Sequence, residues 1–363
     1  MSPNGYTQLI SYIAPSAPAT RRPGVGDEPY LRPEVGFTPK WYHDRLGIDF
    51  GQKFHTDVAH RLTCLSQITD TLREHFGDLP IGSNGDTDGP PDLLTGTFGA
   101  CPVAAIYGIP ILYAENNWPN STHDYLTREQ IAKLEPPDLD HNKFFSVLMD
   151  QLDKIANENG RIDGFINWQG VLNTALRIRG NEIFTDMALE PERVDHLFEC
   201  VATTMVDGMK RVYARQKTSD VDVHHATISN CLVNMVSAEH YRRFLLPWDK
   251  MIAETFGVIG VHNCAWTADP YIPDYSTIPG LGYIDMGQDS DLVTARQTFG
   301  SARRAIMYTP MDVVDKTTDA IKGDLERIAN LYGPCDVVFA DIETHTPDER
   351  VKFLFDTCDK ISQ

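Results

Sequence analysis

The chain has 363 residues, of which 42% are hydrophobic and 23% are charged, a composition typical of a folded protein with a sizeable core. Its formal net charge of −19 argues against a nucleic-acid or anionic-membrane partner, because binding phosphate polymers requires clustered lysine and arginine. No stretch approaches the roughly 20 apolar residues of a membrane helix, and residues 1–14 lack the basic and long apolar regions of a signal peptide. We therefore expect a cytoplasmic protein.

The N-terminal part of the chain, residues 1–77, is expected to form an irregular arm followed by a helical extension. Residues 15–35 are rich in proline, glycine and arginine, which favours irregular structure. Residues 56–76 carry apolar side chains at three- and four-residue spacing, which predicts a helix. The composition of residues 82–91 is that of a loop.

From residue 78 to residue 363, short strand-like segments alternate with longer helix-like segments, which predicts a (β/α)8 TIM barrel. The strand candidates are 79–82, 109–114, 162–167, 221–228, 257–264, 281–286, 304–309 and 336–342. The helix candidates are 143–158, 190–215, 237–256, 289–299, 315–332 and 347–361, and Pro247 should kink or split the third of them. A doubly wound sheet is the alternative, but no GxGxxG motif follows a strand to support it.

The seven cysteines are spread along the chain, odd in number and without a CxxC pair, so they do not indicate a disulfide scaffold. One of them belongs to the most informative motif, His262-Asn263-Cys264, at the end of the apolar run 257–261. Side chains two apart on a strand point the same way. An imidazole and a thiol would therefore converge at the carboxyl end of a barrel strand, where active sites are built.

Imidazole and thiolate are ligands that suit zinc. On the last predicted strand, Asp341 and Glu343 share one direction, and either would complete a three-ligand site with His262 and Cys264 in a closed barrel. Two alternatives stand beside this interpretation. In the first, the cysteine is a packed core residue beside a hydrogen-bonded histidine. In the second, the carboxylates cap the helix that follows instead of binding a metal.

Polar side chains follow several other predicted strands, and such a lining suits a small polar or aromatic ligand. They are Trp168 and Gln169 after 162–167, Asn230 after 221–228, Asp285 within 281–286, and Tyr308 and Asp312 at the end of 304–309. Each residue taken alone is more often structural. Together they predict a pocket at the mouth of the barrel.

Several motifs between residues 145 and 360 occur in a characteristic order: 164–170, 179–182, 189–194, 237–244, 262–264, 289–292 and 346–350. In this order they resemble the uroporphyrinogen decarboxylase superfamily, which includes the zinc- and cobalamin-dependent methyltransferases. The opening 32–39 with 47–50 is similar to corrinoid-linked O-demethylase methyltransferases in particular. The N-terminal arginine-rich signature of the decarboxylase branch is not found in this sequence.

The resemblance implies a barrel in which His-x-Cys binds zinc together with a later cysteine on the last strand. His262 and Cys264 match the first two ligands, but the third position falls on Ala340, beside Asp341. A carboxylate in place of a thiolate would leave a harder, more Lewis-acidic zinc that suits polarising an ether oxygen.

The expected activity is therefore transfer of a methyl group from a methoxylated substrate, with aromatic ethers included, to a corrinoid (cobalamin) carried by a partner protein. Asp285 or Asp312 would supply a proton. The substrate would be positioned by Trp168, Gln169, Asn230 and Tyr308.

Three alternatives stand beside this activity. They are a methylcorrinoid:thiol or folate methyltransferase, a decarboxylase that needs no metal, and a barrel that only binds a ligand. The sequence leaves a homodimer open.

Overall fold

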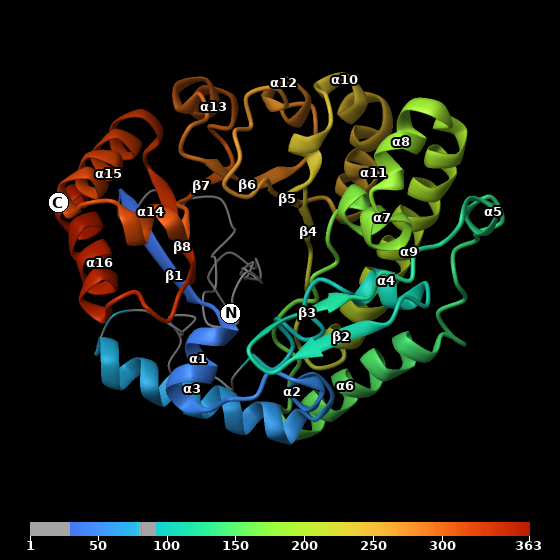
Figure 1. Ribbon diagram of the computed structural model, residues 1–363, viewed down its shortest axis with the longest axis horizontal. Coiled ribbons are helices and arrows are strands. Elements are labelled where there is room, and N and C mark those ends of the chain that lie inside the picture. The colour runs from blue at the N-terminus through green and yellow to red at the C-terminus, as the bar shows by residue number, and fades with distance from the viewer. Residues whose placement is uncertain (1–29, 78, 80, 82–91) are drawn as a thin grey trace.

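The computed structural model describes residues 30–77, 79, 81 and 92–363. In this part of the chain, six parallel strands form one curved sheet in the order β1-β8-β7-β6-β5-β4, with helices around its outside (Figure 1). The strands are β1 (Leu31–Phe37), β4 (Ala226–Ser229), β5 (Ile259–His262), β6 (Leu281–Gly287), β7 (Arg303–Met307) and β8 (Cys335–Ile342). This is the architecture of a TIM barrel, as the sequence predicts.

The first and last strands along the chain, β1 and β8, lie side by side and pair from Leu31↔Cys335 to Phe37↔Ile342. The expectation of an irregular arm over 15–35 is therefore wrong for its final residues, which belong to β1. The strand was missed because Pro33 argues against a strand in the sequence. Proline is tolerated here because β1 is an edge of the hydrogen-bonded sheet. The boundary expected between residues 77 and 78 stays a prediction, although β1 lies on the N-terminal side of it.

Two of the predicted strands, 109–114 and 162–167, do not join this sheet. The segment 109–114 contributes β2 (Ile111–Ala114), which instead pairs antiparallel with β3 (Asn117–Ser121) in a hairpin with a two-residue turn. The segment 162–167 runs without strand pairing next to the start of β4, where the Phe165 ring lies 5.0 Å from that of His225. The candidate 79–82 lies partly outside the described residues.

The predicted helices are present, and their ends shift by a few residues. The described helices are α1 (Pro39–Leu46), α2 (Gln52–Thr56), α3 (Val58–Phe76), α4 (Pro102–Ile106), α5 (Arg128–Ile131), α6 (Lys143–Asn159), α7 (Val171–Arg179), α8 (Glu182–Leu189), α9 (Pro191–Lys217), α10 (Ala238–His240), α11 (Leu246–Phe256), α12 (Ile272–Tyr275), α13 (Leu292–Thr298), α14 (Pro310–Asp315), α15 (Thr318–Tyr332) and α16 (Asp348–Ser362). The interruption expected at Pro247 is a π-helical turn, Tyr241–Leu245, between α10 and α11. Among the described helices, none combines the length and the hydropathy needed to span a bilayer.

The barrel interior is packed with mainly apolar side chains, whereas the amino ends of its strands carry a buried ion cluster. Tyr283, Ala305, Met307, Val338 and Ala340 form a separate inner cluster from β6, β7 and β8. At the amino ends of the strands, the buried carboxylate of Asp336 accepts two hydrogen bonds from Arg303, at 2.6 and 2.8 Å, and a further one from Arg32. This ion cluster joins β7, β8 and β1.

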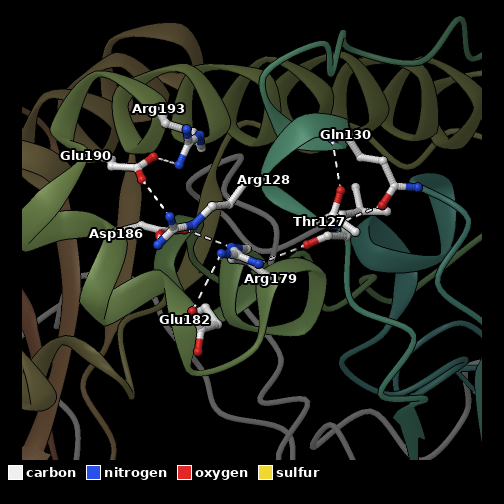
Figure 2. Close-up of polar contacts among 9 residues, drawn as sticks. Thr127, Arg128, Gln130, Arg179, Glu182, Asp186, Glu190 and Arg193 are labelled. Atoms are coloured by element: carbon white, nitrogen blue, oxygen red, sulfur yellow. Dashed lines mark hydrogen bonds and ion pairs between the residues drawn. The ribbon is translucent and has the colours of Figure 1, made fainter.

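The chain between the β2–β3 hairpin and α6 is anchored on α7, α8 and α9 by an arginine–carboxylate network (Figure 2). The buried Arg179 donates to Asp186 at 2.7 Å, and Arg128 pairs with Glu190 at 3.0 Å. Arg193 also pairs with Glu190. Each guanidinium in this network therefore has a carboxylate partner, and the network fixes the segment that leads away from the hairpin.

Candidate metal centre and cavity

Cys231, His262 and Cys264 gather at the carboxyl ends of β4 and β5. Their ligand-type atoms all lie within 4.8 Å of one another. The Sγ atom of Cys264 is 2.8 Å from Sγ of Cys231 and 3.0 Å from Nε2 of His262. Both cysteines are free thiols, so two sulfurs and one imidazole nitrogen converge on one point. The donor set fits zinc, which binds thiolate and imidazole in sites with three protein ligands.

The pairing of β4 with β5 explains why these residues meet. Ser229 lies opposite His262, and the amide of Asn230 continues the ladder by donating to the carbonyl of His262 at 2.7 Å. Cys231 stands two residues after Ser229, and Cys264 stands two residues after His262. Cys264 adopts φ 59°, a conformation that L-residues rarely hold and that recurs at functional sites.

Asp285 on β6 fixes the orientation of the His262 ring. Its Oδ2 lies 2.7 Å from Nδ1 of His262 and 2.9 Å from the hydroxyl of Tyr283, and its Oδ1 accepts from the amide of Asn263 at 2.8 Å. In the neutral ring, this contact keeps the proton on Nδ1, so Nε2, which faces the Cys264 sulfur, is the nitrogen that would bind a metal. Asp285 was expected as a proton donor, but the structure engages both of its oxygens, and its place is that of a positioning residue.

The charges inside the cluster are strongly linked. Burial lowers the pKa of His262, but the negative charges of Asp285 and Cys231 outweigh this effect and raise it to about 10. The hydrogen bond from Cys264 holds the pKa of Cys231 well below its usual value, and the same bond raises that of Cys264. Cys231 is thus the more acidic thiol of the pair.

The carboxylates of the last strand lie outside the three-residue group. Asp341 is half-buried with φ 55°, and burial, together with the charge of Glu343, raises its pKa to about 6. Its charge still acts on Cys264, so Asp341 lies near the cluster. Cys231, and neither Asp341 nor Glu343, lies in the three-residue group with His262 and Cys264.

Cys231 was not among the predicted ligands, although a signal for it existed. The segment 221–228 was predicted as a strand, and Cys231 follows its end. Aligning this strand with 257–264 in parallel would have placed Cys231 level with Cys264. The alignment depends on which strands are neighbours and in which register, and hydrophobic periodicity does not supply that information.

A cavity of about 370 Å³ opens over the cluster of Cys231, His262 and Cys264. Its lining comes from the cluster, the β2–β3 hairpin, α7 and the segment before α7. The lining residues are Gly99, Ala100, Asn117, Trp118, Pro119, Asn120, Asn167, Gln169, Arg177, Ser229, Cys231 and His262. Gln169, predicted to contact substrate, is therefore placed in the cavity wall, where Asn167 and Asn173 hold its amide.

Other predicted site residues point elsewhere. The Trp168 ring packs against Gly208 of α9, in the core. Asn230 donates to the buried Asp249 at 2.9 Å.

Tyr308 and Asp312 also bind neighbouring side chains rather than line the cavity. Tyr308 donates to Asp324 at 2.8 Å, and Asp312 accepts from Gln288 at 2.8 Å. The reason for these differences is local. Residues 162–167 do not form a strand. Asn230 and Tyr308 extend the ladders of β4 and β7 by donating to the carbonyls of His262 and Val338, so alternation turns their side chains to the face opposite that of Ser229 and Met307.

Comparison with known proteins agrees with this architecture. The family model of uroporphyrinogen decarboxylase (URO-D) matches residues 89–361. A solved structure of a methyltransferase from Methanosarcina mazei superposes with a TM-score of 0.64 at 14% sequence identity, covering 93% of this chain and 95% of that one. No curated protein sequence matches the chain significantly. The fold is thus shared with that methyltransferase, and the chain belongs to the uroporphyrinogen decarboxylase family.

Proposed function

We propose that this protein is a zinc-dependent methyltransferase that moves a methyl group from a methoxylated substrate to a corrinoid carried by a partner protein. The observation that carries the proposal is the convergence of Cys231, His262 and Cys264 beneath a cavity at the carboxyl ends of the strands. Three protein ligands leave one position for substrate, which is the pattern of a catalytic rather than a structural zinc site.

The chain's own residues divide the work. Cys231, His262 and Cys264 would hold the metal, and Asp285 keeps the imidazole in the orientation for binding. When bound, zinc would act as a Lewis acid on the ether oxygen. Asp341, whose charge acts on Cys264, would give a proton to the oxygen that loses its methyl group.

The corrinoid protein would bind at the rim of the barrel, at the carboxyl ends of the strands. Met235, Trp266 and Met311 are more than half exposed and follow the carboxyl ends of β4, β5 and β7. Exposed large apolar side chains grouped on one face are typical of protein interaction sites. A corrinoid delivered to this rim would face the cavity where the methyl group is released.

A second candidate is methyl transfer to a thiol, and one observation favours it. With Cys231 in place of a carboxylate, the donor set has two sulfurs, and such a centre is softer than the sequence suggested. A sulfur-rich zinc suits activation of a substrate thiol. The ether is preferred because the cavity offers Trp118, a flat apolar side chain that suits an aromatic ring.

Metal content is the first test. The purified chain is expected to hold about one zinc per molecule, and Cys231→Ser and Cys264→Ser are each expected to lose it. Cys64→Ser is the matched control, because this thiol lies on α3 away from the cluster. Elemental analysis of the four proteins measures the effect. Full zinc content in both cluster variants would contradict the ligand assignment.

The transfer itself is tested with excess cobalamin in the Co(I) state. The zinc-loaded protein and a methoxybenzene derivative should yield methylcobalamin and the phenol, followed by visible absorbance and chromatography. Methylation of an added thiol by methylcobalamin, with no loss of methyl from the ether, would instead support the second candidate.

A further inference from the structure

We propose that Arg177 binds a carboxylate of the substrate, so that the cavity selects a methoxylated single-ring acid over the corresponding neutral ether. This inference rests on the proposed function for the reaction and adds the class of substrate. It follows from the position of one guanidinium group and the chemistry of its neighbours.

Arg177 lies on α7 and lines the same cavity as Cys231 and His262. The hydrogen bonds of its Nη1 atom go to the amide oxygen of Asn120, the hydroxyl of Ser121 at 3.2 Å and the sulfur of Cys101 at 4.0 Å. Burial raises the pKa of Cys101 to about 11, so this thiol carries no charge near neutral pH. The partners of Nη1 are therefore all neutral.

The hydrogen bonds to these neutral partners all use Nη1, so the other two nitrogens of the guanidinium are left for a ligand. Within the described residues, Nε and Nη2 of Arg177 make no hydrogen bond, and no carboxylate lies within ion-pair distance. Arg179, two residues along the same helix, shows the contrast, because it pairs with Asp186 at 2.7 Å. In a chain of net charge −19, a cationic side chain left beside neutral groups in a cavity favours an anionic ligand over a neutral one.

The cavity around Arg177 fits a small aromatic acid. Among its described lining residues, Arg177 is the single Arg, Lys, Asp or Glu, and the others are amides, small residues, Trp118, Pro119 and the cluster residues. A guanidinium binds a carboxylate through two parallel hydrogen bonds, which fixes the orientation of the ligand as well as its charge. The half-buried Trp118 offers a face to the ring, and the volume of about 370 Å³ accommodates one ring with its substituents.

Binding measurements test this assignment without turnover. Isothermal titration at constant ionic strength compares 4-methoxybenzoate with its neutral isostere 4-methoxybenzamide, and the 3-methoxy pair serves as a second geometry. The wild-type chain is expected to prefer the benzoate by about tenfold or more, the size of a charge-assisted contact. Arg177→Gln should lose this preference and retain the affinity for the amide.

Two further variants separate charge recognition from a role of Arg177 in holding the hairpin. Asn120→Asp keeps the contact to Nη1 but supplies an internal carboxylate, so it should weaken benzoate binding and spare the amide. Arg215→Gln makes the same change of net charge at a side chain that pairs with Asp153 on the outside of the molecule, and it should leave both affinities unchanged.

Equal wild-type affinity for benzoate and amide, or failure of all four compounds to bind, would overturn the proposal. So would a preference that survives in Arg177→Gln. If Arg177→Gln loses both ligands, the Asn120→Asp variant decides: selective loss of the benzoate supports the proposal, and unchanged binding overturns it. Because no corrinoid is present, the methyl-transfer reaction can fail while this preference stands, and the reverse also holds.

Discussion

At the scale of single residues, the orientation of His262 in the Cys231–His262–Cys264 group depends on Asp285, which lies outside the group. Asp285 is fully buried, and its two oxygens contact the His262 ring, the Asn263 amide and the Tyr283 hydroxyl. Carboxylates in this position fix the tautomer of a ligand histidine and raise its basicity. The position of Nε2 is thereby set before any ion arrives.

The Asp285→Asn variant should therefore weaken zinc binding by about 10- to 100-fold. The amide can still accept one hydrogen bond, but it carries no charge to balance the imidazole. Zinc affinity is measured by competition with a chelator of known strength. Tyr283→Phe, which removes one contact to the same oxygen, serves as the milder comparison, and unaltered affinity in Asp285→Asn would argue against the positioning role.

At the scale of elements, the packing of α9 on the segment before α7 depends on the absence of a side chain. A Cβ atom added to Gly208 would lie 2.6 Å from the buried ring of Trp168, closer than two carbon atoms can approach without a shift. The helix thus approaches the chain that leads into the cavity wall at Gln169. Small residues at such crossings let the backbone of a helix come close to a large ring.

Replacing Gly208 with alanine should lower the free energy of unfolding by about 1–3 kcal/mol, because overpacking outweighs the gain in helix propensity. Gly323 on α15 is the matched control, since a Cβ atom added there would meet nothing within 4 Å. Gly323→Ala should stabilise by up to about 1 kcal/mol. Urea unfolding of both variants measures the contrast, and destabilisation of both to the same degree would count against this explanation.

Features set by neighbouring residues could be predicted from the sequence, and contacts between distant segments could not. Periodicity along the chain was sufficient for β5, the long helices and the interruption at Pro247. It placed His262 and Cys264 together because they share one strand end. Cys231 escaped because its proximity arises from the pairing of β4 with β5.

Trp168 marks a second limit. It was expected at the mouth of the barrel because it follows the predicted strand 162–167, but these residues form no strand and the ring packs in the core. The segment 109–114 shows a third limit, because its strand exists but pairs locally as β2 rather than in the barrel. For 109–114 the predicted strand exists and its partner was missed, whereas for 162–167 the predicted strand is absent.

At the scale of the whole molecule, the junction of the first and last strands is tied together by charge. Asp336 of β8 lies fully buried between Arg303 of β7 and Arg32 of β1. This cluster sits at the amino ends of the strands, opposite the cavity, where barrel residues serve stability rather than chemistry.

Loss of the Asp336 charge should destabilise the fold strongly, because a buried Arg303 would keep its charge without a partner. We expect Asp336→Asn to lower the free energy of unfolding by about 3–5 kcal/mol. Asp153→Asn removes the partner of Arg215 at an exposed pair and should change it by no more than about 1 kcal/mol. Denaturant titrations compare the two, and a mild effect at Asp336 would show that the arginines find other partners or water.

The hairpin of β2 and β3 forms part of the cavity wall without belonging to the barrel sheet. It shares no backbone ladder with the six parallel strands, yet it supplies one side of the chamber above the sulfur and imidazole donors. Exchange of residues 111–121 would therefore change which ligands fit the cavity and would leave Cys231, His262 and Cys264 in place. Ligand fit on this side of the cavity and the sulfur–imidazole group thus depend on separate segments of the chain.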